Sequence, residues 1–210
     1  MPWNLYYSER NILEKELEQL SSLHRLAFAA SICERFLPNY SAFAKENGLG
    51  NPMVLRNALD EAWLVVQGNS ANAEKINKLI QNCKVLPPDE DHEETYKYEA
   101  SMTCGVICYM LSACLEPTPQ NVAQVAYMAE DIIFETIEVE RDIANPGCST
   151  NMTFDEMEKD AANHRFWIKE AAKQNLDFQK LEEVKTLDQK FIESFRKSCV
   201  DDGKSMIDLY

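Results

Sequence analysis

Helix-start signals recur along this sequence, and they limit its fold more than any other feature. Asn51-Pro52 and Thr118-Pro119 each place an N-capping residue before a proline, a combination favoured in the first turn of a helix. Thr153 and Glu156 have the spacing of a capping box. Only six glycines occur in 210 residues, and no apolar–polar alternation is long enough to predict a β-strand. The sequence therefore predicts an all-α fold.

These helix-start signals, together with helix-stop signals, divide the chain into about eight or nine helices. Pro38 is expected to end the second helix, because proline has no N–H to donate inside a helix. Residues 85–94, with two prolines and a run of acids, form the most loop-like stretch. We expect one all-helical bundle over residues 1–210, with residues 147–210 either inside it or as a C-terminal extension. The predicted helices span roughly residues 8–19, 22–37, 41–47, 52–67, 70–83, 93–115, 119–143, 153–175 and 177–199.

The net charge of −14 bounds the partners that such a chain can have. It repels nucleic-acid phosphates and anionic lipid, and it attracts a basic partner. Many cytoplasmic proteins are acidic only to stay soluble, so both interpretations stay open. The longest apolar run, residues 104–115, is too short to span a membrane. Seven cysteines without an export signal indicate reduced thiols. We therefore expect a cytoplasmic protein without nucleic-acid or membrane partners.

The helix expected over residues 22–37 is apolar on nearly every side, which is typical of a helix at the centre of a fold. His24, Ser31 and Glu34 form its one narrow polar stripe. A buried carboxylate must be paired, because an isolated buried charge is costly. Arg35 is adjacent in sequence and points elsewhere, so Glu34 and Arg35 should each pair with a charge on another helix. They either fix the helix register or line a cleft.

The strings FAASICERFLPNYSAF, residues 28–43, and LRNALDEAW, residues 55–63, resemble the bacterial YjaG-like family, domain of unknown function 416. The resemblance covers about residues 20–66 and continues less closely to about residue 140. It does not extend past Pro146. It implies an all-α fold and no settled activity. The positions that carry it are Cys33, Glu34, Arg35, Pro38, Asn39, Tyr40, Phe43, Asp60 and Trp63.

Motifs for catalysis or metal binding are lacking in this sequence. No histidine follows a glutamate by three residues, and neither H-E-x-x-H nor C-x-x-C occurs. Cys104 and Cys108 lie one helical turn apart, but their neighbours are Val, Ile, Met and Leu, which is typical of small core residues. The sequence thus predicts no metal, no cofactor and no catalytic residue, and it favours a protein that is not an enzyme.

The helix expected over residues 119–143 carries an acidic face formed by Asp131, Glu135 and Glu138. This face is either simply solvated or a docking surface for a basic protein. The second interpretation suggests a non-enzymatic interaction protein, most concretely a bacterial immunity protein that neutralises a cognate toxin by direct binding. An apolar helix face also leaves a homodimer open.

The alternative hypothesis is an enzyme or small-ligand-binding protein. Its site would lie near Glu34 and Arg35, where several polar and aromatic side chains follow one another in sequence. The candidate residues for a pocket, or for structural ion pairs, are His24, Glu34, Arg35, Asn39, Tyr40, Asp60 and Trp63.

Overall fold

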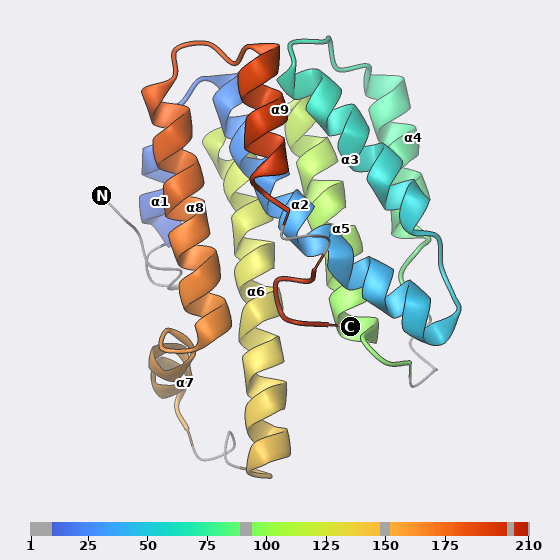
Figure 1. The fold of residues 1–210 in the computed structure, drawn as a ribbon, viewed down its shortest axis with the longest axis vertical. Helices are drawn as coiled ribbons and strands as arrows, with labels where there is room; N and C mark the ends of the chain where they lie inside the picture. Colours follow the sequence, from blue (N-terminus) through green and yellow to red (C-terminus); the bar gives the residue numbers. More distant parts are fainter. Residues whose placement is uncertain (1–9, 89–93, 148–151, 201–203, 210) are drawn as a thin grey trace.

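The computed structural model describes residues 10–88, 94–147, 152–200 and 204–209 (Figure 1). These residues form helices and no strand, which confirms the predicted all-α fold. The helices within the described ranges are α1 Arg10–Leu17, α2 Ser22–Asn47, α3 Pro52–Val66, α4 Ala73–Lys84, α5 Lys97–Leu115, α6 Pro119–Ala144, α7 Phe154–Ala161, α8 Arg165–Glu183 and α9 Gln189–Lys197.

Three of the predicted helix starts are confirmed by their capping hydrogen bonds, whereas the helices predicted from residues 70 and 93 begin at Ala73 and Lys97. Asn51 and Thr118 accept backbone N–H groups at the starts of α3 and α6, each with a proline in the first turn. Thr153 and Glu156 form the complete capping box of α7. These local bonds satisfy donors that a helix leaves unpaired at its N-terminus, and for that reason they can be predicted from sequence.

The predicted end of the second helix at Pro38 is wrong. α2 continues through Pro38 to Asn47 and ends at Gly48, whose positive φ of 66° closes the helix in the left-handed conformation. The short helix predicted over residues 41–47 is the last part of α2. A proline inside a helix costs about 3 kcal/mol, but Phe36, Tyr40 and Phe43 on both sides of it are fully buried, and their burial outweighs that cost.

Two boundaries in the C-terminal part also differ from the prediction. The helix expected over residues 153–175 is two helices, because His164 caps α8 after a break that follows Ala161. α8 then runs past Asp177, the predicted start of the last helix, to Glu183. The predicted helix over residues 177–199 is therefore the end of α8 followed, after a break, by α9. Residues 85–88 lie outside helices as predicted, and residues 89–93 of that loop lie outside the described residues.

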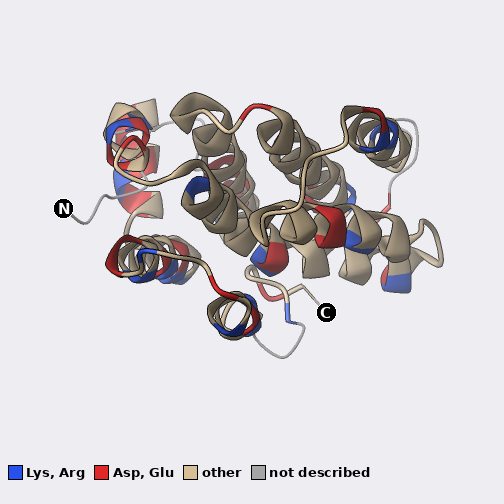
Figure 2. Cartoon of the chain, turned by 90° about the horizontal axis from the view of Figure 1, so that it is seen from above, with Lys and Arg blue, Asp and Glu red and all other residues tan. Residues whose placement is uncertain are grey.

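α2 is the hub of the bundle and packs against α3, α5, α6, α8 and α9. Figure 1 places α1 and α8 on one side of this centre and α3 and α4 on the other. From above, the central helices are mostly free of charged residues, which gather on the outer helices (Figure 2). α5 is long and apolar enough by composition to cross a membrane, but it packs among α2, α3, α4 and α6 as a core helix.

Candidate functional site

Arg35 lies at the centre of a buried ion cluster between α2 and α8. Its Nε and Nη2 donate to the two carboxylate oxygens of Glu170 over 2.8 and 2.6 Å, a bidentate pair. Its Nη1 donates over 2.9 Å both to Asp177 and to the backbone carbonyl of Ser31. Arg35, Glu170 and Asp177 are all buried. The prediction that Arg35 pairs with a charge on another helix is confirmed.

Two further side chains of α8 complete this arrangement. Lys173 forms an ion pair with Asp177, and Gln174 donates to Glu170 over 3.0 Å. Burial disfavours the charged guanidinium, but the adjoining carboxylates outweigh it and raise the pKa of Arg35. We call Arg35, Glu170, Lys173 and Asp177 the Arg35 cluster. With two positive and two negative charges it is balanced, and it fixes α8 against α2.

Glu34 is the centre of a second cluster, which joins α2 to α3 and α9. Arg56 donates to both carboxylate oxygens of Glu34 over 2.7 and 2.9 Å, and Trp63 Nε1 donates over 2.7 Å. Arg196 also donates to Glu34 over 2.7 Å and pairs with Asp60. The predicted pairing of Glu34 is therefore confirmed. We call these five residues the Glu34 cluster.

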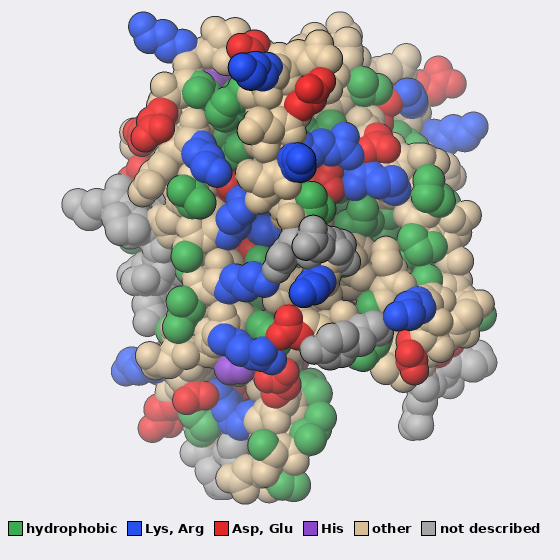
Figure 3. Space-filling model, in the orientation of Figure 1, with side chains coloured by type: hydrophobic (Ala, Val, Ile, Leu, Met, Phe, Trp, Pro, Cys, Tyr) green, Lys and Arg blue, Asp and Glu red, His purple; other side chains and the backbone are tan. Residues whose placement is uncertain are grey.

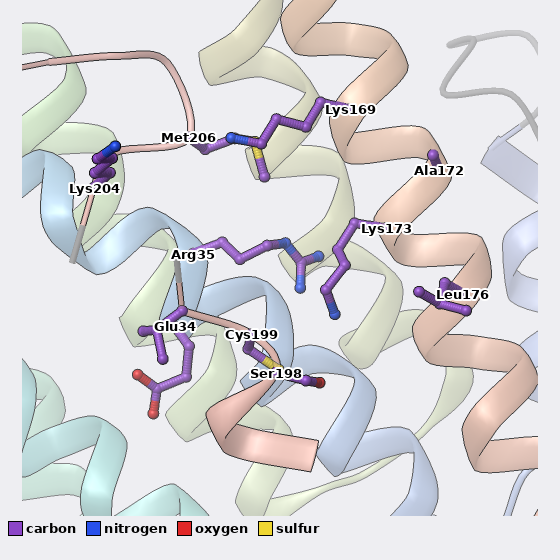
Figure 4. A pocket seen from close by; sticks show the side chains of 11 residues that line it. Glu34, Arg35, Lys169, Ala172, Lys173, Leu176, Ser198, Cys199, Lys204 and Met206 are labelled. Carbon is purple, nitrogen blue, oxygen red and sulfur yellow. The ribbon is translucent and has the colours of Figure 1, made fainter. Parts of the chain in front are cut away.

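A pocket of about 430 Å³ opens beside both clusters, between α2, α8 and residues 198–200 and 204–206, which follow α9 and are called the C-terminal segment below (Figure 4). Glu34 and Arg35 both line it. In Figure 4 the Arg35 side chain extends toward Lys173, whereas the Glu34 carboxylate points away from Lys173. The two interpretations of these residues are thus compatible, because both side chains fix helices and also form part of a pocket wall.

Basic side chains outnumber acidic ones among the residues that line this pocket, although the whole chain carries a net charge of −14. One carboxylate and four basic side chains line it, namely Glu34, Arg35, Lys169, Lys173 and Lys204. In the space-filling view, Lys and Arg side chains gather in the middle of this face (Figure 3). Apolar side chains complete the wall, among them Ala172, Leu176, Val200 and Met206. The pocket therefore combines positive charge with apolar surface.

Sequence reasoning missed the α8 side of this site. Glu170, Gln174 and Asp177 lie at offsets of four and seven residues, so they share one face of a helix. This polar stripe was not recognised, because the predicted helix boundary near residue 176 divided it. A predicted helix that continues through Asp177 would place all three side chains on one face and would indicate the partner of Arg35.

The structure does not bring the other candidate residues into this pocket. His24 lies at the start of α2, where its Nε2 is 3.0 Å from the carbonyl of Val184. Tyr40 is buried, and its hydroxyl donates to the carbonyl of Leu86 over 3.3 Å. Asn39 accepts a hydrogen bond of 2.6 Å from Ser205, and thereby holds the C-terminal segment on α2. Each of these three side chains makes a contact that supports the fold.

The acidic face of α6 is largely paired within the chain. Asp131 accepts from Arg10 over 2.7 Å, and Glu138 pairs with Arg141. Glu135 is exposed. Two of the three predicted partner-binding residues thus already have basic neighbours, which reduces the free negative charge of this face.

The cysteines of the described residues are free thiols, and most of them are buried. Burial raises the pKa of Cys104 to about 12. Within residues 10–88, 94–147, 152–200 and 204–209, no three or more His, Cys, Asp or Glu side chains are grouped to hold a metal ion. Cys104 and Cys108 lie on α5, where Cys104 packs in the core as expected.

The chain is similar to several bacterial proteins without an assigned function. It is 26% identical to the uncharacterised protein YjaG of Escherichia coli K12 over 106 residues, 50% of this chain and 54% of that protein. The match thus spans about half the length of that relative. An uncharacterised protein of Haemophilus influenzae is 27% identical over 135 residues, 62% of this chain and 68% of that protein.

A crystal structure of a DUF416 family protein from Shewanella baltica has the same fold. It aligns with a TM-score of 0.81 over 93% of this chain and 97% of that chain, at 22% identity. A family model described as a protein of unknown function, DUF416, matches residues 12–209, including the part after Pro146 that the sequence motifs did not cover. This chain therefore belongs to the DUF416 family.

Proposed function

We propose that this protein binds a small molecule in the pocket between α2, α8 and the segment after α9. One observation carries the proposal, namely that two ion clusters, each centred on a buried side chain of α2, border a pocket of about 430 Å³. Known small-molecule sites have volumes of about 300–1,000 Å³ and are largely formed before the ligand arrives. Clusters that fix three helices around the pocket supply this preformed shape.

The chemistry of the pocket wall favours binding over catalysis. Cys199 is the thiol on this wall, and it is buried, with its Sγ donating to the carbonyl of Phe195 over 3.1 Å. Burial raises the pKa of Cys199 to about 11, so its thiol is a poor nucleophile near neutral pH. The carboxylates of the Arg35 cluster are already paired with cations of the chain, and neither Glu170 nor Asp177 is among the residues that line the pocket.

Filling the pocket tests this proposal. Ala172 and Leu176 line the pocket from α8 and are exposed, so tryptophan at both positions should block the site while the helix still folds. We expect native mass spectrometry of the protein purified from its own cells to show a bound small molecule. The Ala172→Trp/Leu176→Trp variant should lose it. Ile168→Trp, at an exposed position of α8 that does not line the pocket, is the matched control.

A bound molecule that survives in the filled variant would place the site elsewhere. Wild-type protein that carries no molecule, and that gains no thermal stability from any member of a metabolite library, would contradict the proposal altogether.

A second candidate function is the binding of a basic protein, as expected of an immunity protein that neutralises a toxin. The exposed end of α6 favours it, because Glu135 there is followed by Val139 and Ile143, which are 56% and 77% exposed. Apolar side chains beside a carboxylate suit the centre and rim of a protein interface. The internal pairing of Asp131 and Glu138 speaks against a purely electrostatic contact.

Charge reversal at this end of α6 tests the second candidate. If a basic protein docks there, it should be retained in a pull-down from the cells of origin, and Glu135→Lys with Ile143→Gln should release it. Glu182→Lys, an exposed change on α8, is the control of equal charge. Retention that is the same in both variants would exclude the α6 surface as the docking site.

A further inference from the structure

We infer that the ligand of this pocket is an organic anion, with an anionic oxygen group next to the lysines and an apolar body against α8 and the C-terminal segment. The inference rests on the proposed function and names the ligand class of the same site. It follows from three features of the wall. These are the position of its cations, the N–H donors of those cations that are not used within the chain, and the apolar surface beside them.

The cations approach the pocket from two sides. Lys169 and Lys173 lie one turn apart on α8, and Lys204 comes from the segment after α9 (Figure 4). Glu34 is the one carboxylate on the wall, and its oxygens already accept hydrogen bonds from Arg56, Trp63 and Arg196. Because the Arg35 cluster is balanced, Lys204, which belongs to neither cluster, adds positive charge to the wall that a ligand meets.

Arg35 and the lysines have different roles at this wall. Five donor contacts of Arg35, on all three of its nitrogens, go to Glu170, Asp177 and Ser31, so few of its N–H groups remain for a ligand. Lys173 has three N–H donors and gives one to Asp177. Its other donors are available for an anionic oxygen. Arg35 thus positions α8, and Lys173 and Lys204 are the ligand-binding groups.

The apolar part of the wall is exposed, although such side chains are usually buried. Leu176 and Val200 are 45% and 44% exposed, and both line the pocket with Met206. A purely inorganic anion would leave this surface in water. An apolar ligand body would cover it, and the burial of apolar surface is favourable. An anion with a hydrocarbon body matches both halves of the wall.

Calorimetric titration of the full chain with four compounds of one chain length tests this inference. Octanoate and octyl phosphate carry the anionic group, octanol is neutral, and octylamine is cationic. We expect at least one of the two anions to bind about tenfold or more tightly than octanol and octylamine. Binding by both anions means that any anionic oxygen group suffices, and binding by one identifies the head group.

Charge reversal of Lys204 places the anion within the pocket. Lys204→Glu should weaken binding of the anion about tenfold, because it replaces an attraction with a repulsion. Lys190→Glu is the matched control, since Lys190 is exposed on α9 and does not line the pocket. The same loss in both variants would show an effect of overall charge and overturn the assignment.

The two proposals fail in different ways. A neutral or cationic molecule found by mass spectrometry in the wild type and lost on filling the pocket would overturn the anion inference and leave the binding function intact. Equal affinity for octanol and octanoate would do the same. If the proposed binding function is wrong, native mass spectrometry should show no bound molecule, and none of the four octyl compounds should bind in the calorimetric titration.

Discussion

Replacing Arg35 by methionine should lower the free energy of unfolding by about 3–5 kcal/mol. The substitution leaves the carboxylates of Glu170 and Asp177 buried, with Gln174 donating to Glu170 and Lys173 as the remaining cation of the cluster. An uncompensated buried charge is far more costly than the loss of a surface ion pair, because water cannot reach it. Urea unfolding followed by circular dichroism measures the change.

Glu34→Met is the informative comparison for this result. It leaves Trp63 Nε1 without its acceptor, which should cost about 1–3 kcal/mol. Its guanidinium partners, Arg56 and Arg196, have side chains that are 25% and 33% exposed, so water can solvate them when the carboxylate is gone. We therefore expect Glu34→Met to cost less than Arg35→Met. The reverse order would mean that the Glu34 cluster is the more important of the two.

A triple variant separates lost charge balance from lost shape. Arg35→Met combined with Glu170→Met and Asp177→Leu removes the three buried charges together and replaces them with apolar side chains. Such replacements of buried ion clusters are often neutral for stability. We expect the triple variant to recover most of the stability that Arg35→Met loses. If it is no more stable than the single variant, packing rather than charge holds α8 in place.

Stability should fall as the pH rises from about 5 to 9, and Glu130 is the cause. Glu130 lies on α6 and is buried, and Arg10 donates to it over 3.1 Å. Burial raises its pKa to about 8, against the opposing effect of Arg10. Since the folded-state pKa exceeds the unfolded value, the folded protein binds the proton more tightly. Its contribution is complete below the unfolded pKa and is lost as the pH rises through the folded one.

The size of this effect is on the order of a few kcal/mol, because each unit of pKa difference corresponds to about 1.4 kcal/mol. Thermal or urea unfolding across this pH range measures it. Glu130→Gln keeps a hydrogen-bonding side chain without the titration, so its stability should change little between pH 5 and 9. Glu135→Gln, at an exposed position of the same helix, should retain the wild-type slope. An unchanged slope in Glu130→Gln would assign the pH dependence to another group.

The clusters explain why only half of the candidate site could be predicted. An apolar helix that carries Glu34 and Arg35 requires partners for both charges, and the structure supplies them. Which residues those partners are depends on how α3, α8 and α9 pack on α2. Arg56 follows Glu34 by 22 residues, but Glu170 and Arg196 lie 135 and 162 residues from their partners in sequence. Spacing within one helix carries no information about such distant pairs.

Similarly, the boundaries that sequence reasoning missed are those that tertiary packing decides. Pro38 has a strong local preference to end a helix, yet the buried aromatic side chains around it keep α2 continuous. Asp177 and Phe178 are buried, and Phe178 packs edge-on against Phe28 of α2. This burial outweighs any local preference of the residues near 176 to end the helix. Local preferences are worth about 1–3 kcal/mol, and the burial of several large side chains exceeds them.

By itself, the sequence determined the all-α fold, most helix starts, the central place of α2 and the need to pair Glu34 and Arg35. These features depend on local hydrogen bonds, on helical periodicity and on the cost of a buried charge, all of which act over a few neighbouring residues. The position of the pocket, and the gathering of basic side chains on its wall, depend on tertiary packing. Lys173 and Lys204 meet there from distant parts of an acidic chain, because the packing of α8 and the C-terminal segment on α2 brings them together.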